Sequence, residues 1–435
     1  MNDKPTNAKG GVSRREFVRM AGTASLAATA GVGLSSRLLG ADAGGTDTIR
    51  MGLVGCGGRG TGAVCDCVSS SEGVEVVALG DLFEDKARKC LQNLQRKIPA
   101  EKMKVTADAV FWGFDAFQKV VDSKCNYVIF ATPPHFRPQH LRAAVEAGKH
   151  AFVEKPVAVD AVGARHVIET GELARKKGVA IVTGTQKQHQ AHYVEVMKRI
   201  HDGAIGDIVA AQCWFNTGGL WVIEKKPKMS DMEWQCRNWL YFTWLSGDHI
   251  VEQHIHNLDV IYWAVGELPR RVLGMGGRQV RTDPKYGNIF DHFAVEYEYA
   301  SGIRMSSYCR QTPGCTGRVS ERIVGTKGQA YLTGGVGIIE GENPYKYEGR
   351  NWNPQVQEHA DMIASIRKNE PLNDARRIAE STLMAIAGRM SAYSGRELKW
   401  DWLANASKLD LRPPKYEFGP LPVEPVAVPG KTTLV

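Results

Sequence analysis

The sequence predicts an α/β protein in which an N-terminal, doubly wound parallel sheet precedes a second α/β domain with an open, mostly antiparallel sheet. Three observations predict this fold class. The 435 residues are enough for two folded domains. Apolar runs alternate with amphipathic segments over residues 48–183, as in parallel strands joined by crossover helices. Over residues 184–400, β-like runs alternate with glycine-containing turns, which is typical of antiparallel pairing.

The first predicted strand, residues 49–54, leads into a glycine-rich turn and then into a helix-forming segment, residues 63–68. Glycines at the spacing G-x-G-x-x-G allow a tight turn, close approach of a pyrophosphate and close packing of the helix on the sheet. The phosphates would bind free N–H groups at the helix N-terminus. The alternative is a purely structural turn. The residues predicted to bind a dinucleotide here are Gly55, Gly57, Gly58, Arg59 and Gly60.

A second predicted strand, residues 74–80, ends at Asp81. This acid lies 21 positions after Gly60, close to the roughly 20 expected for the carboxylate that hydrogen-bonds the adenosine ribose. Its negative charge would repel the 2′-phosphate of NADP, so the sequence favours NAD over NADP. The alternative is that Asp81 only caps the next helix.

The remaining elements of the first domain follow in order. Helices are expected over residues 84–95, 114–121, 139–147 and 161–177, and strands over residues 127–131, 151–153 and 180–182. Polar loops follow two of these strands, and ligands of an open α/β sheet bind beyond the carboxyl ends of its strands. We therefore expect four loops to converge on one crevice. The further residues predicted to contact the cofactor are Thr132, Pro133, His135, Glu154 and Lys155.

The second half of the chain predicts strands and helices in mixed order. Helices are expected over residues 193–201, 250–265, 357–367 and 375–393. Strands are expected over residues 208–215, 271–275, 293–299, 304–308, 322–324 and 330–332. Residues 401–435, rich in proline and valine toward their end, are expected to form an extended tail.

Residues 1–43 have the pattern of an export signal. Arg14-Arg15 is followed by an apolar stretch, residues 20–34, and then by the small residues Ala41 and Ala43, which suit a cleavage site. The stretch is short and rich in Gly, Ser and Thr, so we expect no membrane span in the mature protein. We expect export by the twin-arginine machinery to the periplasm or the cell exterior. The alternative is a disordered N-terminus with a chance arginine pair.

Composition argues against several classes of protein. Of the net charge of +8, +3 lies in residues 1–43, and the rest is spread along the chain without a long Lys/Arg run. This distribution gives little support for nucleic-acid binding. The nine cysteines have no regular spacing and do not indicate a disulfide framework. Most suit small buried hydrophobes, and pairing of Cys309 with Cys315 is left open.

Taken together, the motifs resemble those of the Gfo/Idh/MocA oxidoreductases, the family of glucose–fructose oxidoreductase and inositol 2-dehydrogenase. The resemblance covers roughly residues 48–400. Its most specific part is Glu154-Lys155-Pro156, and it also includes the glycine-rich turn, Asp81, Thr132-Pro-Pro and Glu252-x-x-x-His256-x-x-Asp259. It implies an N-terminal Rossmann domain over residues 48–183 and a substrate and oligomerisation domain over residues 184–400. It also implies association into dimers or tetramers.

The resemblance implies roles for individual residues. Lys155 corresponds to the catalytic lysine beside the nicotinamide, and His256 to the histidine near the reacting hydroxyl. Asp259 corresponds to an acid that helps hold substrate hydroxyls, so all three are expected to contact substrate. The family usually has Asp four residues before the histidine, whereas this chain has Glu252. It commonly has Gly two residues before the histidine, where this chain has His254 and the pocket wall is expected to differ.

Oxidation of a secondary alcohol needs a base for the hydroxyl proton. Burial beside a cationic nicotinamide would disfavour the ammonium form of Lys155, and His256 suits proton relay. Glu252 and His256 would share one face of a continuous helix, so we expect Glu252 to orient the imidazole. A cis bond before Pro156 would re-aim the lysine. An exposed lysine and a core histidine are the alternatives.

Two further patterns leave alternatives open. Asp248, His249, Glu252, His254 and His256 raise the possibility of a metal site, but His254 and His256 would not share a helix face, and no metal is predicted. Five tryptophans lie between residues 214 and 244. Stacking on sugar rings and packing in a core or subunit interface account for them equally well.

The leading hypothesis is an NAD-dependent oxidoreductase acting on a secondary alcohol of a sugar, inositol or glycoside. The alternative is a glycosidase that uses NAD transiently, through oxidation, elimination, water addition and re-reduction. Lys155 favours the first, whereas export favours the second because free NAD is scarce outside the cytoplasm. An exported protein would carry NAD as a tightly bound group loaded before export. Intact Lys155 and His256 argue against a non-catalytic sugar-binding protein.

Overall fold

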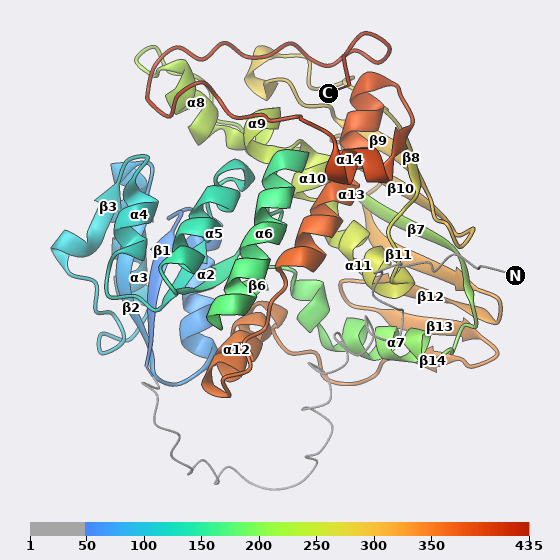
Figure 1. Cartoon of the computed structure of the whole chain (residues 1–435), viewed down its shortest axis with the longest axis horizontal. Coiled ribbons are helices and arrows are strands. Elements are labelled where there is room, and N and C mark those ends of the chain that lie inside the picture. The colour runs from blue at the N-terminus through green and yellow to red at the C-terminus, as the bar shows by residue number, and fades with distance from the viewer. Residues whose placement is uncertain (1–47, 435) are drawn as a thin grey trace, which may run out of the picture.

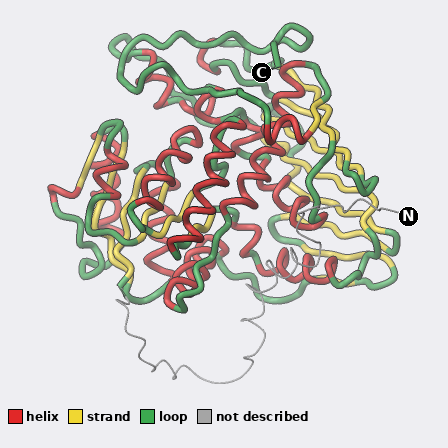
Figure 2. Tube along the Cα trace, in the orientation of Figure 1, coloured by secondary structure: helices red, strands yellow, loops and turns green. Residues whose placement is uncertain are grey.

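The computed structural model describes residues 48–434, so the predicted export segment, residues 1–43, lies outside the described residues. Two sheets organise the described chain, with α6 (Ala161–Lys177) and α13 (Ala375–Ser394) among the helices between them (Figures 1 and 2). The fold class predicted from the sequence is confirmed: the N-terminal sheet is parallel and the second is mostly antiparallel.

The N-terminal sheet has the strand order β3-β2-β1-β4-β5-β6, the doubly wound order of dinucleotide-binding domains. Its strands are β1 (Ile49–Val54), β2 (Val74–Asp81), β3 (Val110–Trp112), β4 (Tyr127–Phe130), β5 (His150–Val153) and β6 (Ile181–Thr183). Its helices are α2 (Gly58–Ser70), α3 (Glu84–Lys97), α4 (Ala116–Val121), α5 (Arg137–Glu146) and α6 (Ala161–Lys177). β1 and β4 are almost wholly buried, as apolar runs covered by helices on both faces should be.

The second sheet has nine strands in the order β14-β13-β12-β11-β7-β10-β9-β8-β15. Only β10 and β7 pair in parallel. The strands are β7 (Ile208–Thr217), β8 (Arg271–Gly277), β9 (His292–Glu298), β10 (Arg304–Gln311), β11 (Arg318–Gly325), β12 (Gly328–Thr333), β13 (Gly337–Gly341), β14 (Tyr345–Lys346) and β15 (Leu398–Lys399). Along each strand of this sheet, alternate side chains point to opposite faces. Helices cover one face, and no helix of the described chain covers the other (Figure 1).

Two late helices connect the domains. α12 (Pro354–Arg367) lies beside α2, and its Met362 and Ile363 join the core of the N-terminal domain. α13 (Ala375–Ser394) lies between α6 and β8 (Figure 1). The N-terminal domain is therefore completed by residues from the far end of the sequence. α7 (Ala191–His201) covers β13 near the edge of the second sheet.

The helix predicted over residues 250–265 is wrong, because the chain forms two helices. α10 (His249–Glu252) ends before His254, and α11 (Ile255–Val265) begins after it. The His254 ring is buried and lies 2.7 Å from Ser307 Oγ in β10. A buried imidazole needs a hydrogen-bond partner, and this partner lies outside the helix, where sequence periodicity gives no information.

The insertion between β7 and α10 contains α8 (Asp231–Arg237) and α9 (Thr243–Ser246), which the sequence did not predict. The predicted tail begins within a further helix, α14 (Trp400–Asn405), and only later continues without helix or strand. This tail crosses over both domains and passes α8 (Figure 1). The nine cysteines are all free thiols, including buried Cys309 and exposed Cys315. Within residues 48–434, no helix combines the length and apolar character needed to cross a membrane.

Three buried histidines predict acid sensitivity. Burial lowers the pKa of His140 and of His254 to about 3, and that of His135 to about 4. In the unfolded chain they titrate near about 6.5, so the unfolded state binds more protons between these values. The neutral rings stabilise the fold fully above about pH 6.5, and this stability is lost as pH falls, by up to about 1.4 kcal/mol per pH unit for each histidine.

We expect the free energy of unfolding in urea to decrease from pH 7 to pH 5, because the histidines with a lowered pKa outnumber the buried carboxyls, such as Glu358, whose raised pKa opposes this decrease. His254→Gln keeps a polar side chain opposite Ser307. It should reduce the slope of the free energy of unfolding against pH by up to about 1.4 kcal/mol per pH unit, which corresponds to one proton. His292→Gln is the matched control, because the His292 side chain is 44% exposed. Equal slopes for wild type and His254→Gln would contradict the prediction.

Candidate active site

The four loops expected to converge do so through direct contacts. Gly55 packs against the backbone of Ala131 and Thr132. The Cys56 N–H donates to Asp81 at 2.7 Å, which joins the glycine-rich turn to the end of β2. Arg137 joins the other two loops, donating to the carbonyls of Thr132 (2.9 Å) and Pro156 (2.5 Å). The carboxyl ends of β1, β2, β4 and β5 thus form one edge, where an open α/β sheet binds its ligands.

The glycine-rich turn has the geometry of a phosphate cradle. Gly55 has φ of +99°, and a Cβ on Gly60 would lie 1.9 Å from the Gly55 carbonyl oxygen, so both positions require glycine. A Cβ on Gly57 or Gly58 would meet no atom within 4 Å. No side chain caps the N-terminus of α2, and its first turn carries no acid. Free helix N–H groups facing open space fit a pyrophosphate.

Asp81 retains capacity for a ribose. Its two carboxylate oxygens each accept one backbone N–H, from Cys56 at 2.7 Å and from Phe83 at 2.9 Å. Each oxygen has a further lone pair that can accept a hydroxyl. Burial raises the pKa of Asp81, and the two N–H donors oppose this. The carboxylate is therefore positioned by the backbone and can still take the two hydroxyls of a ribose.

The Arg59 side chain, predicted to contact the cofactor, pairs with three carboxylates. Its guanidinium contacts Glu154 at 2.5 Å, Asp66 at 3.1 Å and Glu358 at 3.5 Å. Glu358 lies on α12 and is buried. Burial and the neighbouring Glu154 raise its pKa well above its usual range. This contact between residues 299 positions apart in the chain could not be read from sequence spacing.

Lys155 is placed at this edge and held by Glu252. Its Nζ donates to the Glu252 backbone carbonyl at 2.5 Å and to Glu252 Oε1 at 3.1 Å. Both side chains are 12% exposed, and the Lys155–Pro156 bond is cis. The interpretation of Lys155 as an exposed surface lysine is therefore wrong. Through this pair, α10 of the second domain contacts the edge of the parallel sheet that bears the glycine-rich turn.

His256 is the second residue of α11 and is half-buried. Burial, Lys155, Lys187 and Arg59 lower its pKa well below the usual range, so the ring is neutral at neutral pH. Within residues 48–434 its ring makes no hydrogen bond. The shared helix face predicted for Glu252 and His256 is wrong, because α10 ends between them. Glu252 contacts Lys155 instead, and the imidazole is left with both nitrogens available.

Asp259 is engaged with the protein itself. Its Oδ1 accepts from Arg377 and from Ser381, both at 2.7 Å, and its Oδ2 accepts from Gln188 at 2.9 Å. The residue is 2% exposed. Asp259 therefore holds α11, α13 and the segment after β6 together, and any contact with substrate would have to use its remaining lone pairs.

Asp259→Ala is expected to destabilise the protein by about 3 kcal/mol, because Arg377 loses its buried partner and keeps only the more exposed Asp374, at 3.3 Å. Urea unfolding measures the loss. Asp361→Ala is the control, since Asp361 pairs with His189 at a more exposed position. Wild-type stability combined with a raised KM for substrate would instead assign Asp259 a role in substrate binding alone.

Sequence spacing missed two charged groups near the site. Lys187 is buried, forms a 2.5 Å ion pair with Glu321 and contributes to the lowered pKa of His256. Arg137 is buried as well. Burial lowers its pKa to about 10, with Glu154 and Glu252 opposing. A single arginine or lysine in a loop carries no distinctive signal, so only the tertiary contacts reveal these two residues.

Thr132, Pro133 and His135, also predicted to contact the cofactor, lie in the loop that follows β4 at the same edge of the sheet. His135 Nε2 is 2.8 Å from Tyr416 Oη of the tail, and Thr132 Oγ1 is 3.3 Å from His140 Nδ1. Pro133 precedes a single 3₁₀ turn that leads into α5. The C-terminal tail thus contacts the loop that follows β4 through Tyr416.

The histidines considered for a metal point to different partners. His249 Nδ1 lies 2.9 Å from Asp248 Oδ1, whereas His254 faces Ser307. No group of three or more His, Cys, Asp or Glu side chains in the described part of the chain is placed to hold a metal ion. Three of the five tryptophans, Trp234, Trp239 and Trp244, pack in a cluster with Phe83 and Phe242. Packing accounts for these three.

Family profiles match most of both domains. The profile described as "Oxidoreductase family, NAD-binding Rossmann fold" matches residues 49–185. A second, described as "GFO/IDH/MocA C-terminal domain", matches residues 193–331. Together they cover more than half of the chain.

Individual proteins show more distant similarity. Inositol 2-dehydrogenase of Klebsiella pneumoniae is 28% identical over 259 residues, 59% of this chain and 65% of that protein. A "Glycosyl hydrolase family 109 protein" of Streptomyces coelicolor is 26% identical over 162 residues, 37% of this chain and 32% of that protein. The matches thus span less than two thirds of these relatives. The aldose-aldose oxidoreductase of Caulobacter crescentus, solved with glycerol, shares the fold: the TM-score is 0.63 at 19% identity, over 81% of this chain and 99% of that one.

Proposed function

The chain belongs to the Gfo/Idh/MocA oxidoreductase family, and from this we propose that it is an NAD-dependent oxidoreductase acting on a secondary alcohol of a sugar, inositol or glycoside. One observation carries the proposal: the Lys155–Glu252 pair lies at the carboxyl edge of the parallel sheet, beside an uncapped glycine-rich helix N-terminus. The similarity to an inositol 2-dehydrogenase supports a polyol or carbohydrate substrate.

We propose NAD as the cofactor, with residues 48–183 as its domain. Bound there, its nicotinamide supplies the hydride acceptor. The N–H groups of the glycine-rich turn would hold the pyrophosphate, and Asp81 the adenosine ribose. NAD is favoured over NADP for two reasons. Asp81 would repel a 2′-phosphate, and the Arg59 guanidinium is already paired with Glu154 and Glu358.

Proton handling is assigned to Lys155 and His256. The His256 ring is neutral, so one of its nitrogens can accept a hydrogen bond from the substrate hydroxyl and relay its proton. The Lys155 ammonium, fixed by two bonds to Glu252, can donate a hydrogen bond to the substrate oxygen and stabilise negative charge on it. In the reverse direction, the same groups return a proton to the oxygen. Glu252 therefore positions Lys155.

The tail supports a tightly held cofactor. Phe418 stacks on Phe83 with ring centroids 5.8 Å apart, two residues beyond Asp81. Tyr416 contacts His135 and packs against Phe114. The tail thus covers the edge where the adenosine would bind, which would slow cofactor release. We propose that NAD is loaded before export by the twin-arginine pathway, directed by residues 1–43, and stays bound in the periplasm or outside the cell.

A redox-neutral glycosidase is the second candidate. The similarity to a glycosyl hydrolase family 109 protein favours it, and so does a captive cofactor, because the NADH formed by oxidation would then be used to reduce the same sugar. The same residues would serve both reactions, so only the products distinguish them.

The test uses the purified full-length protein. It is analysed for bound NAD(H) and then incubated with myo-inositol, free aldoses and p-nitrophenyl glycosides. Net change in NADH with an alcohol substrate supports the oxidoreductase. Release of p-nitrophenol without net NADH supports the glycosidase. Absence of bound NAD together with no binding of added NAD would overturn both.

We propose that the open face of the second sheet joins copies of the chain in a dimer or tetramer. Strand alternation leaves apolar side chains exposed on this face: Val209, Leu273, Met275, Tyr308 and Tyr331. Met275 is 72% exposed. An apolar strip of this kind is typical of an interaction surface.

Met275→Glu is accordingly expected to reduce the molar mass in solution measured by light scattering. Val280→Glu, an exposed apolar position outside the sheet strands, should leave the mass unchanged. A monomeric wild type would contradict the proposal.

A further inference from the structure

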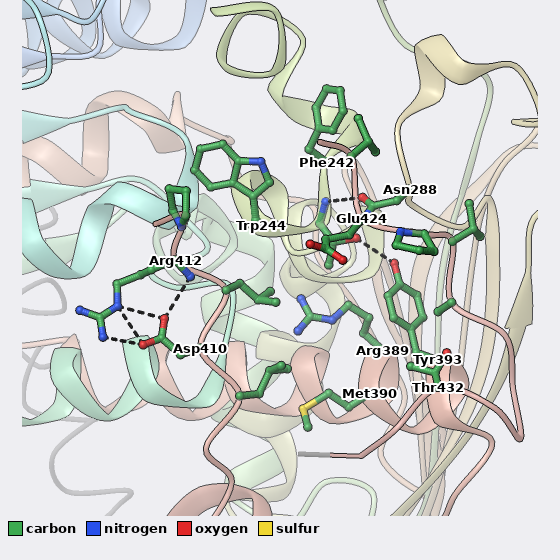
Figure 3. Close-up of a pocket in the computed structure, with 18 of the residues that line it drawn as sticks. Phe242, Trp244, Asn288, Arg389, Met390, Tyr393, Asp410, Arg412, Glu424 and Thr432 are labelled. Atoms are coloured by element: carbon green, nitrogen blue, oxygen red, sulfur yellow. Dashed lines mark hydrogen bonds and ion pairs between the residues drawn. The ribbon is translucent and has the colours of Figure 1, made fainter. Parts of the chain in front are cut away.

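A cavity of about 530 Å³ lies between the C-terminal tail, α9 and α13 (Figure 3). Its volume is within the range of small-molecule sites. Much of its wall consists of tail residues 409–414 and 421–427. None of the residues predicted to bind cofactor or substrate lines it.

Arg389 of α13 is the distinctive group in this cavity. It is 1% exposed, and its Nη1 donates to the carbonyls of Val159 at 2.8 Å and Gly247 at 3.0 Å. Its Nη2 has no hydrogen-bond partner within residues 48–434, and its guanidinium forms no ion pair there. Burial lowers the pKa of Arg389, and Tyr393, Asp160 and Asp248 oppose this from a distance. A buried N–H without an acceptor is unfavourable, so a ligand that accepts from Nη2 would remove this cost.

The other charged and polar groups of the wall are already engaged or exposed. Arg412 pairs with Asp410. The Tyr393 hydroxyl donates to Asp248 at 2.6 Å. Glu424 is exposed to water. Figure 3 shows the Arg389 guanidinium among these residues. The rest of the wall is largely apolar and includes Phe242, Trp244, Met390, Leu411, Leu421 and Val426.

We propose that this cavity binds a small monocarboxylate with an apolar body, whose carboxylate accepts from Arg389 Nη2. One buried cation with one free N–H edge matches one carboxylate. A phosphate would require several donors, which the wall does not offer. The apolar residues would cover an aliphatic or aromatic body. This site is separate from the proposed catalytic one and does not depend on the reaction assigned there.

Arg389 also connects the cavity to the catalytic segments. The Val159 carbonyl lies four residues after Lys155, and the Gly247 carbonyl lies just before α10, which ends at Glu252. Loss of Arg389 would therefore disturb the active site even without a ligand. Binding, not activity, is the readout that isolates the proposal.

The experiment titrates the full-length protein with sodium octanoate by calorimetry, with octanamide and octylamine as neutral and cationic probes of the same length. We expect saturable binding of octanoate with one site per chain, at least tenfold tighter than octanamide, and no saturable binding of octylamine. Arg389→Met should abolish the preference for octanoate. Arg412→Met should retain it, because that arginine lines the same cavity but is paired with Asp410 and largely exposed.

Three outcomes would overturn the proposal: no saturable octanoate binding, equal affinity for octanoate and octanamide, or an unchanged preference in Arg389→Met. The comparison of the three probes uses wild-type protein, so it decides the question even where Arg389→Met does not fold.

Discussion

Lys155→Ala is expected to lower kcat/KM by about 10²- to 10⁴-fold, the range usual for loss of a group that handles a proton or charge in the transition state. The variant removes the ammonium that donates to Glu252 and that would face the substrate oxygen. Bound NAD should remain, because the glycine-rich turn and Asp81 are untouched. Initial rates with the substrate found in the panel, together with NAD content, measure the two effects separately.

Two variants make this result specific. Glu252→Gln keeps a hydrogen-bond acceptor beside Lys155 but removes its charge, so we expect a smaller loss of kcat than in Lys155→Ala. Lys119→Ala is the control. Lys119 lies on α4, is exposed and pairs with the exposed Asp115, so this variant should have wild-type kinetics. Wild-type kcat/KM in Lys155→Ala would exclude Lys155 from the chemistry. Loss of NAD together with activity would indicate that Lys155 holds the cofactor instead.

Much of the N-terminal domain could be predicted because its signals are local. The apolar run at β1 and the helix over residues 161–177 match the structure at both ends, since burial on both faces and helical periodicity are properties of contiguous residues. β3, by contrast, has three residues and is only partly buried. A strand so short has too few residues to show a period.

The position of the candidate site could be predicted from the sequence. Which of its residues form hydrogen bonds and ion pairs with one another could not. Parallel strands place their carboxyl ends together, so the glycine-rich turn, Asp81 and Lys155 were expected at one edge. The partner of Lys155 lies 97 positions away. α10 ends before His254, and the His254 ring lies 2.7 Å from Ser307 Oγ in a distant strand. Contacts of this kind arise from tertiary packing and leave no periodic trace.

Gly57→Ala is expected to fold normally and yet lose at least tenfold in affinity for NAD. A Cβ at Gly57 would meet no protein atom within 4 Å, and its φ of −74° is open to alanine. Alanine at such a position stabilises a fold slightly, if it changes stability at all. The methyl group would, however, occupy the space through which a pyrophosphate approaches the backbone. NAD content after purification and titration of the stripped protein with NAD measure the loss, which at tenfold is about 1.4 kcal/mol.

Two other glycines separate this effect from a change in the fold. Gly60→Ala would place a Cβ 1.9 Å from the Gly55 carbonyl oxygen, so it should lower both stability and NAD binding. Gly335→Ala also meets no atom within 4 Å but lies in the turn between β12 and β13, so it should change neither. Only a ligand in the cradle makes Gly57→Ala behave differently from Gly335→Ala. Equal NAD affinity in these two variants would therefore show that the space beside Gly57 does not hold the pyrophosphate.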